Sequence, residues 1–323
     1  MISPTYGRPA EVEEFLESLT RLDFHDFEVI LCDGSPGGEV EPIARRFEER
    51  LPLFFIYEKN IAVSPARNRA AQVARGEWLI FLDSDCLVPP HYLQSVAKAL
   101  AEGACDVFGG PDLAARDFSL IQKAISHVMT SFLTTGGLRG GRYRTSAYRP
   151  RSFNMGVRRE AFQQVGGFGN LLCGEDVDLS IRLEKAGFRI CFLDEAFVYH
   201  KRRTTWKNFF RQVYRFGAAR LLLARRHRGE LKATHLFPVL FTAGMGFLVF
   251  LFFFHYRLAL CGAGLYAFYL ILVGIEATLK YRNPALFFPV IWATCCQFWG
   301  YALGFLHNVW QVYVRKKPEG LRL

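Results

Sequence analysis

The sequence predicts an α/β fold with a mostly parallel sheet, followed by a helical membrane region. Up to about residue 200, apolar strand-like stretches alternate with helix-like ones, and after residue 233 the chain becomes predominantly apolar. Strand–helix alternation is typical of a mostly parallel, Rossmann-like sheet with helices on both faces. Such sheets bind ligands beyond the carboxyl ends of their strands. The 323 residues are enough for one large domain with additional segments, or for two domains.

The predicted strands are short apolar runs bounded by turn residues. They cover residues 27–35, 53–58, 78–85, 105–110 and 188–200. The predicted helices cover residues 10–22, 39–50, 65–75, 90–103 and 174–187. In the third of these helices, Ser64 is the expected cap, Pro65 suits the first turn and Gly76 can close the far end. Residues 136–152 have no apolar period and hold five Arg and four Gly, which predicts a mobile basic loop.

Basic residues cluster just before the apolar C-terminal region. The net charge is +10 with a pI near 9.3, and residues 201–232 hold eleven Lys or Arg against one acid. Aromatic side chains and the cations Lys207, Arg211 and Arg215 occupy different faces of the helix predicted at 205–228. This is typical of a helix in a membrane interface, although an ordinary solvated helix is the alternative. The pattern favours an anionic cytoplasmic leaflet, and no nucleic acid, as the partner.

Three apolar segments follow, at about 236–254, 258–276 and 285–310, and each approaches the ~20 residues needed to cross a bilayer. Lys280 and Arg282 are expected to return to the cytoplasm. A third full crossing would place the basic tail outside, so either the third segment is re-entrant or the positive-inside rule fails; the sequence leaves this open. We expect a multi-pass inner-membrane protein with its catalytic domain, 1–203, in the cytoplasm. A basic interfacial helix, 204–232, and a transmembrane region, 233–323, complete the predicted organisation.

The cysteines and the N-terminus indicate the compartment. None of the eight cysteines has the spacing of a metal site, so we expect reduced residues in the cytosol and no zinc. The N-terminal residues lack the basic start and apolar core of a signal peptide. Residues 2–4 resemble the last part of a strand, and we expect the natural start to lie upstream.

The stretch "WLIFLDSDC", residues 78–86, raises the question of function, because two carboxylates follow a strand that reads as buried. Burying a carboxylate costs free energy unless a partner compensates it. Asp83 and Asp85 at a strand end can reach a divalent cation held jointly with phosphate oxygens. A turn in which the aspartates only accept bonds from backbone amides is the simpler alternative.

Several further motifs accompany this pair, and together they resemble family 2 inverting glycosyltransferases. They are "ISPTYGRP" at the start, "CDGS" at 32–35, "SPARNRAA" at 64–71, "FLDSDC" at 81–86 and "GEDVDLSIRL" at 174–183. The resemblance covers roughly residues 1–220. It implies a GT-A fold, a nucleotide-diphospho-sugar donor, with UDP the expected nucleotide, and a Mn²⁺ or Mg²⁺ ion. The membrane segments are similar to those of exopolysaccharide-type members that extend a lipid-linked or glycan acceptor.

The resemblance also implies roles for individual residues. Pro4, Thr5 and Arg8 would line the nucleotide pocket, and Asp33 would bond the base. Arg67 would lie near the donor phosphates. Asp83 and Ser84 would contact the sugar nucleotide, and Asp85, with Asp83, would bind the metal. His200 corresponds to a further metal ligand of many members, and a structural residue is the equal alternative there.

Asp176 corresponds to the catalytic base, with Glu175 as the fallback. Inversion is a single displacement, so one carboxylate must take the proton of the acceptor hydroxyl while the metal stabilises the leaving diphosphate. Acids at a helix N-terminus are also common for dipole reasons alone. "QVYRF", residues 212–216, is similar to a motif of processive synthases, and Gln212, Arg215 and Phe216 are candidate acceptor contacts. Because Phe216 replaces the usual Trp and few apolar segments are present, single addition is favoured over processive synthesis.

Two other classes of protein compete with this interpretation. A catalytically silent membrane module that binds a nucleotide has no need for Asp83, Asp85 and Asp176 together. A nucleotidyltransferase also uses a strand-end acid and a metal, but it needs a Gly-rich loop with a basic residue near the N-terminus. "SPTYGRP" has a single glycine, so this class ranks last.

Overall fold

The structure is a computed structural model that describes all residues except 104, 114–117, 137–147, 172, 202–203 and 318–323. Its residues form two compact units, Met1–Ala115 with Leu138–Lys201, and Arg116–Gly137 with Arg202–Leu323. Residues 118–136, which the sequence-based boundaries place in the catalytic domain, therefore pack with the C-terminal unit. Most of the loop predicted at 136–152 lies outside the described residues.

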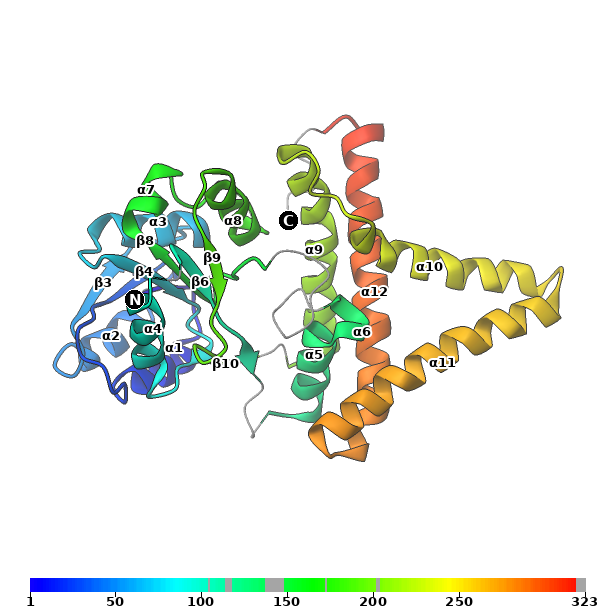
Figure 1. Ribbon diagram of the computed structural model, residues 1–323, viewed down its shortest axis with the longest axis horizontal. Helices are drawn as coiled ribbons and strands as arrows, with labels where there is room; N and C mark the ends of the chain where they lie inside the picture. The colour runs from blue at the N-terminus through cyan, green and yellow to red at the C-terminus, as the bar shows by residue number, and fades with distance from the viewer. Residues whose placement is uncertain (104, 114–117, 137–147, 172, 202–203, 318–323) are drawn as a thin grey trace. The chain divides into compact units, whose positions relative to one another are not determined.

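The first unit is built on a seven-stranded sheet in the order β3-β2-β1-β4-β8-β6-β9 (Figure 1). The strands are β1 (Ile2–Thr5), β2 (Val29–Asp33), β3 (Leu53–Tyr57), β4 (Trp78–Leu82), β6 (Val107–Gly109), β8 (Asn154–Arg158) and β9 (Ile190–Phe192). Only β8 runs antiparallel to its neighbours in this sheet, β4 and β6. The predicted mostly parallel α/β fold is confirmed, and β8 is a strand that the sequence did not predict.

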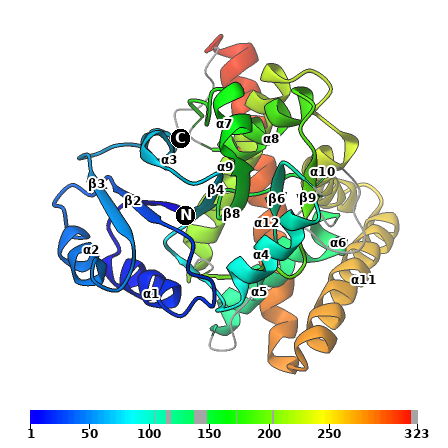
Figure 2. The ribbon, with the colours of Figure 1, turned by 60° about the vertical axis from the view of Figure 1, so that its left-hand side comes forward.

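Helices cover both faces of this sheet, and each face has its own core (Figure 2). On one face lie α1 (Pro9–Leu19), α2 (Glu41–Phe47) and α4 (Tyr92–Ala101). On the other lie α3 (Val63–Val73), α7 (Arg159–Gln164) and α8 (Glu175–Lys185). Successive strand residues point to opposite faces. In β2, accordingly, Leu31 joins the first core and Ile30 and Cys32 join the second.

The expected cap of α3 is wrong. The helix begins one residue before Ser64, and Ala62, in the cap position, makes no side-chain cap bond. At the far end, the chain becomes extended at Ala74 rather than closing at Gly76. The Glu28 carboxylate accepts hydrogen bonds from the backbone amides of Arg75 and Gly76. The side chain of Glu28, distant in the sequence, therefore accepts from the backbone amides at this end of α3, where Gly76 was expected to close the helix.

A second, three-stranded sheet in the order β5-β10-β7 completes the first unit. It contains β5 (Cys86–Leu87), β7 (Asp112–Leu113) and β10 (Val198–His200). The single strand region predicted at 188–200 is thus two strands in two different sheets. A turn separates them, in which the Ala196 amide donates to Leu193 O, and Ala196 O accepts from the Asn154 side chain. This turn moves the chain from the large sheet to the small one.

The second unit is helical. Its helices are α5 (Leu120–Thr130), α6 (Phe132–Thr135), α9 (Trp206–Arg226), α10 (Ala233–Phe252), α11 (Tyr256–Tyr281), η1 (Pro284–Leu286), α12 (Phe287–Val309) and the π-helical η2 (Trp310–Val314). Three of its segments, α10, α11 and Pro284–Val314, are long and apolar enough to cross a membrane by length and composition. The sequence missed α5, whose buried His127 lies 3.3 Å from Glu276 on α11.

The α9 and α12 helices pack side by side so closely that their backbones are in contact, and glycine makes this possible. A Cβ atom placed on Gly304 would lie 1.9 Å from Tyr214 O, and one on Gly217 would lie 2.0 Å from Tyr301 O. Small residues at such seams are typical of tightly packed apolar helices. The Asn308 side chain adds a hydrogen bond of 2.7 Å to Ala218 O. The apolar face of α9 is therefore covered by protein.

We expect Gly304→Ala to destabilise the second unit by about 1–3 kcal/mol, because the added methyl must push α9 and α12 apart. Gly264→Ala is the matched control, since nothing lies within 4 Å of a Cβ atom at that α11 position. Helix propensity alone favours Ala at both sites. Thermal unfolding of the full chain in detergent measures the difference. Equal stability of the two variants would show that the seam is looser than described.

Candidate active site

The carboxyl ends of β1 and β2 lie side by side and bring Asp33 to Thr5. The two residues are paired in the parallel register of these strands. The Thr5 hydroxyl donates to Asp33 Oδ1 over 2.7 Å, and the Ser35 hydroxyl donates to the same oxygen over 2.6 Å. Asp33 is fully buried, and its Oδ2 atom has no hydrogen-bond partner among the described residues. A buried acceptor of this kind calls for a donor from outside the protein.

The small sheet brings His200 to the Asp-x-Asp stretch. His200 pairs with Cys86 in the antiparallel register of β10 and β5, and the Lys201 amide donates to Asp85 O. His200 Nε2 consequently lies 3.2 Å from Asp85 Oδ1. Ligand atoms of Asp85, Cys86 and His200 lie within 4.8 Å of one another. A carboxylate and an imidazole are suitable ligands for a divalent cation such as Mn²⁺, so the residues fit the implied ion.

Cys86 does not suit that ion as a ligand. Burial raises the pKa of its thiol well above the ordinary value, and nearby Asp85 and Asp83 act in the same direction. The thiol also donates to Phe153 O. A metal ligand must be the thiolate, and a hard cation prefers oxygen. Asp85 and His200 therefore remain the suitable pair.

Sequence reasoning missed Asp112 in this cluster. Its carboxylate is almost fully buried, and its Oδ2 lies 3.8 Å from Nδ1 of His200, on the opposite side of the ring from Asp85. The parallel register of β10 and β7 places Asp112 there, because Val198 pairs with it. The signal was available: Asp112 follows the strand predicted at 105–110, as Asp83 follows its own strand.

Arg67 links the Asp-x-Asp stretch to the acidic start of α8. Its guanidinium is 2% exposed; one terminal nitrogen lies 2.7 Å from Asp83 Oδ1 and the other 2.9 Å from Glu175 Oε1. The ring of Phe168 lies beside the guanidinium, 5.3 Å away. Burial and the charge of Asp176 raise the pKa of Glu175, and the ion pair with Arg67 opposes that shift. One buried cation thus links the first aspartate of Asp-x-Asp to the acid beside Asp176.

Asp176 lies at the start of α8, where the helix offers free amides. Its Oδ1 accepts from the Val177 amide over 2.7 Å, and Oδ2 accepts a longer bond from the Ser152 amide. Arg151 stands 3.7 Å from Oδ1. Unlike Glu175, Asp176 has no close ion pair with a fully buried cation among the described residues. Asp176 is therefore the better placed of the two to receive a proton.

The remaining candidates are spread over both units. Arg8 is half exposed and lies 3.5 Å from Asp85 Oδ2, while Pro4 and Ser84 are half-buried at the same strand ends. Gln212, Arg215 and Phe216 belong to α9 in the second unit, where Phe216 packs against an apolar core. Their proposed contact with an acceptor stays a prediction.

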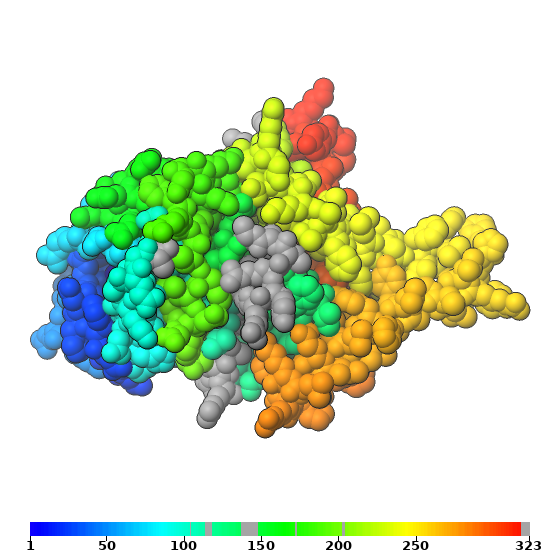
Figure 3. Space-filling view, in the orientation of Figure 1, coloured from blue at the N-terminus to red at the C-terminus, as the bar shows by residue number. Residues whose placement is uncertain are grey.

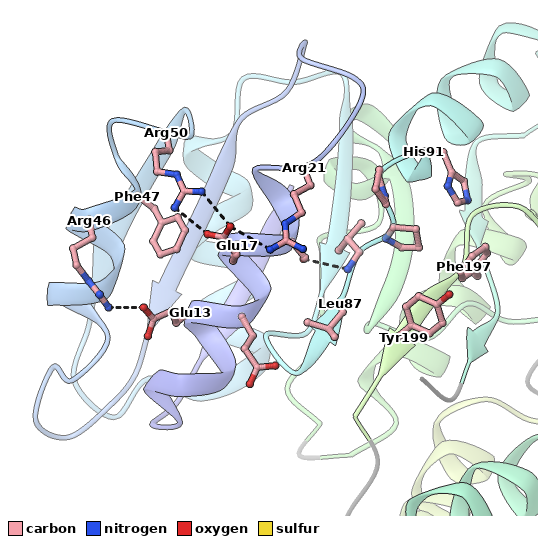
Figure 4. A pocket seen from close by; sticks show the side chains of 15 residues that line it. Glu13, Glu17, Arg21, Arg46, Phe47, Arg50, Leu87, His91, Phe197 and Tyr199 are labelled. Atoms are coloured by element: carbon pink, nitrogen blue, oxygen red, sulfur yellow. Dashed lines mark hydrogen bonds and ion pairs between the residues drawn. The ribbon is translucent and has the colours of Figure 1, made fainter. Parts of the chain in front are cut away.

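A groove of about 790 Å³ also opens on the first unit, between α1, α2 and the segment 87–91 (Figure 4). Most of its charged side chains pair with one another, Glu17 with Arg21 and Arg50, and Glu13 with Arg46, while Glu14 pairs with Lys201. None of the acidic site residues described above lines it. The acids at the strand ends, rather than this groove, define the candidate active site.

A mostly parallel sheet with Asp-x-Asp at a strand end, and an acidic helix start facing it, defines a glycosyltransferase of the GT-A fold. The family model of glycosyl transferase family 2 matches residues 1–166, and the chain belongs to this family. The succinoglycan biosynthesis protein ExoA of Rhizobium meliloti (strain 1021) is 28% identical over 251 residues, 74% of each chain. A Campylobacter jejuni GalNAc(5)-diNAcBac-PP-undecaprenol β-1,3-glucosyltransferase is 25% identical over 112 residues, 34% of this chain and 36% of that one.

A solved structure confirms the fold. The mannosyltransferase PcManGT from Pyrobaculum calidifontis, in complex with GDP-Man and Mn²⁺, superposes with a TM-score of 0.59. The match covers 96% of this chain and 86% of that one, at 19% identity. The likeness therefore extends beyond the sheet domain, and at this identity it is a likeness of fold.

We expect Arg67→Gln to lower the stability of the first unit by about 3–5 kcal/mol, because it leaves Asp83 and Glu175 without their buried cation. Arg69→Gln is the matched control on the same helix, because Arg69 is exposed and donates a hydrogen bond to Gln72 rather than to an acid. Thermal unfolding of the full chain in detergent compares them. A loss no larger than that of the control would mean that the two acids are held by other contacts.

Proposed function

We propose that this glycosyltransferase moves a sugar, with inversion, from a nucleotide-diphospho-sugar to a lipid-linked or glycan acceptor at the cytoplasmic face of the membrane. The observation that carries the proposal is the joining of Asp83 and Glu175 by Arg67, with Asp85 and Asp176 next to them in the chain. In this arrangement the carboxylates proposed to contact the donor, to hold the metal and to accept the proton would share one site. A protein that only binds a nucleotide has no use for the last of these.

The donor's base is proposed to bind at Asp33. Its Oδ2 atom can accept a hydrogen bond from an N–H group of a base, and a uracil ring carries such a group. Thr5 and Ser35 hold Oδ1, so the carboxylate is oriented before the nucleotide arrives. Pro4 and Arg8 line the same strand ends, and Asp83 and Ser84 would contact the ribose or the sugar.

Arg67 is proposed to position the acids rather than to bind the donor phosphates directly. Both of its terminal nitrogens are engaged, and the side chain is 2% exposed, so contact with a phosphate would require an ion pair to break. Arg8, half exposed and close to Asp85, is the better placed cation for the diphosphate. The motif residue Arg67 thus acts through Asp83 and Glu175.

Asp85 and His200 are proposed to hold a divalent cation, which when bound neutralises the leaving diphosphate. Nε2 of His200 faces Asp85, so the proton on the ring belongs on Nδ1, facing Asp112. Carboxylates behind a ligating histidine fix its tautomer and orientation in many metal sites. Asp112 is therefore proposed as a positioning residue for His200.

Asp176 is proposed to take the proton from the attacking acceptor hydroxyl. The backbone amide of Val177 donates a hydrogen bond to the Oδ1 atom of Asp176, which fixes the direction of the carboxylate. Glu175 is held by Arg67 instead. The acceptor is proposed to approach along the membrane, where the exposed cations of α9 attract an anionic leaflet. Gln212, Arg215 and Phe216 would contact it.

We expect Asp85→Asn to weaken Mn²⁺ binding at least tenfold, because a charged ligand is lost, while the fold is kept. Asp112→Asn should weaken it about tenfold through misorientation of His200. The exposed Asp194 provides the control Asp194→Asn, which should bind Mn²⁺ as the unchanged protein does. Calorimetric titration of the full chain in detergent measures all three affinities. Unchanged Mn²⁺ affinity in Asp85→Asn contradicts the metal assignment whatever the activity.

We expect Asp176→Asn to keep donor affinity but to slow transfer by roughly a hundredfold or more, the usual scale for loss of a general base. Glu175→Gln is the comparison, since it removes the neighbouring charge and should disturb stability more than turnover. Sugar transfer in membranes from a panel of nucleotide-sugars, together with donor binding, separates the two effects. If Asp176→Asn weakens donor binding and leaves turnover intact, Asp176 is a helix cap and not the base.

A further inference from the structure

The three long apolar helices of the second unit differ in how much protein covers them. In the most apolar stretch of each helix, protein buries 11% of the residues in α10 and 17% in α11, but 56% in the segment Pro284–Val314. Apolar side chains are exposed on several sides of α10 and α11, and at the tip of their hairpin Phe252, Phe253 and Phe254 are consecutive exposed residues. A helix apolar on all sides needs lipid around it, whereas a half-covered helix does not.

The protein that covers α12 is largely α9, and the two helices run parallel in a fixed register. Phe210 lies against Gly300, Tyr214 against Gly304, and Ala218 accepts a hydrogen bond from Asn308. Each step of four residues on α9 is matched by four on α12. The offset is 90 residues, so Lys207 is level with residue 297, near the middle of α12.

This register decides where α12 can lie. Lys207, Arg211, Arg215, Arg225 and Arg226 are exposed along the length of α9. If α12 crossed the bilayer, α9 would lie beside it in the hydrocarbon, and the α9 cations would be spread from the midplane of the bilayer to one surface. The α9 helix itself is too polar to count as a candidate span. Charges on the lipid-facing side of a buried helix are strongly unfavourable. The pair α9–α12 therefore fits the membrane interface and not the hydrocarbon.

The outer face of α12 agrees with this placement. Six exposed large side chains follow one another at intervals of 4, 11, 3, 4 and 3 residues, all sums of three and four, which puts them on one stripe of the segment Pro284–Val314. They are Phe288, Trp292, Leu303 and Leu306 of α12, and Trp310 and Tyr313 of η2. A stripe rich in aromatic residues, opposite a protein-covered face, is typical of a helix lying in the interface plane.

The hairpin of α10 and α11 has the opposite character (Figures 1 and 3). The α10 helix of 20 residues is about 30 Å long, the thickness of the hydrocarbon core. It contains no Asp, Glu, Lys or Arg, and α11 has none between Arg257 and Glu276. Figure 3 shows the outer part of this hairpin extending beyond the other helices of its unit. Both helices can therefore cross.

We propose that only the α10–α11 hairpin crosses the membrane, and that α12 lies with α9 in the cytoplasmic interface, its aromatic stripe toward the lipid. The tail beginning at Arg315 then stays on the same side as Lys280 and Arg282, as the positive-inside rule requires. Arg257 at the short outer turn is the only Lys or Arg on the far side. This arrangement removes the conflict that three full crossings create, and it rests on the proposed membrane location of the enzyme.

Reporter fusions to the full chain in a Gram-negative bacterium test the number of crossings. Alkaline phosphatase, active only in the periplasm, should be active when inserted at His255 and inactive when fused after Leu323. Green fluorescent protein after Leu323 should be fluorescent. An active phosphatase at the C-terminus would establish a third crossing and overturn the proposal. Inactivity at both positions would overturn the hairpin crossing.

Cysteine labelling in inside-out vesicles tests the placement of α9 and α12. Lys207→Cys, Arg211→Cys and Arg215→Cys should all react with a membrane-impermeant maleimide. Leu265→Cys is the matched control, because Leu265 is 71% exposed on α11 but would face lipid and stay unlabelled. Labelling of Leu265→Cys at the rate of the α9 variants contradicts the hairpin insertion. Protection of the α9 variants contradicts the interfacial pair.

Sugar transfer in the same vesicles keeps this outcome apart from the proposed function. Vesicles that transfer sugar while Leu265→Cys is labelled would refute the topology and leave the enzyme assignment standing. A correct topology without transfer from any nucleotide-sugar tested would refute the function alone. Recovery of the chain in the soluble fraction would refute the membrane location on which both rest.

Discussion

The buried guanidinium of Arg67 is the interaction on which the candidate active site depends. Two carboxylates at the ends of separate elements repel each other and resist burial, and a shared cation compensates both costs. Arg67 does this with one terminal nitrogen on Asp83 and the other on Glu175. The α3 helix that carries Arg67 packs on the sheet through the small residues Ala66, Ala70 and Ala71. That close packing brings a long side chain beneath the strand ends without leaving a void.

The second constraint is the short sheet β5-β10-β7. Asp85 and His200 are 115 residues apart in the sequence, and the pairing of β5 with β10 in this sheet brings them together. Pairing of His200 with Cys86 and of Val198 with Asp112 lines up a carboxylate, an imidazole and a second carboxylate. Each strand is two or three residues long, so the geometry comes from register rather than from the stability of the strands. Register is what fixes which side chains share a face.

These two features show what could be predicted from sequence. The strand-end acids Asp33, Asp83 and Asp85 could be found, because apolar runs and turn residues are local signals. The antiparallel β8 and the division of 188–200 into two strands could not, because they depend on pairing between distant segments; Asp112 follows a predicted strand, but only its pairing with Val198 places it beside His200. The expected closure at Gly76 failed for the same reason, because the distant Glu28 accepts hydrogen bonds from the amides of Arg75 and Gly76 at that end of α3. Residue types indicated the chemistry, and long-range pairing determined the geometry.

In the C-terminal unit, too, contacts between distant segments distinguish helices that are all apolar in the sequence. Composition identifies three apolar segments, but Pro284–Val314, which contains α12, has a lower mean hydropathy than α10 and α11 (1.3 against 1.9 and 2.2) and is covered by protein to a larger extent. The greater coverage of α12 arises from Gly217, Gly300 and Gly304, which let the backbones of α9 and α12 come into contact. A cationic helix is thereby packed against an apolar one. If α12 faces the lipid as proposed, the outward cations of α9 stay in water at the membrane surface, whereas the inward acids of the sheet depend on Arg67. The charged donor from water and the acceptor proposed to lie in the bilayer plane would then meet where the surface charges stay solvated and the charges of the site are compensated inside the protein.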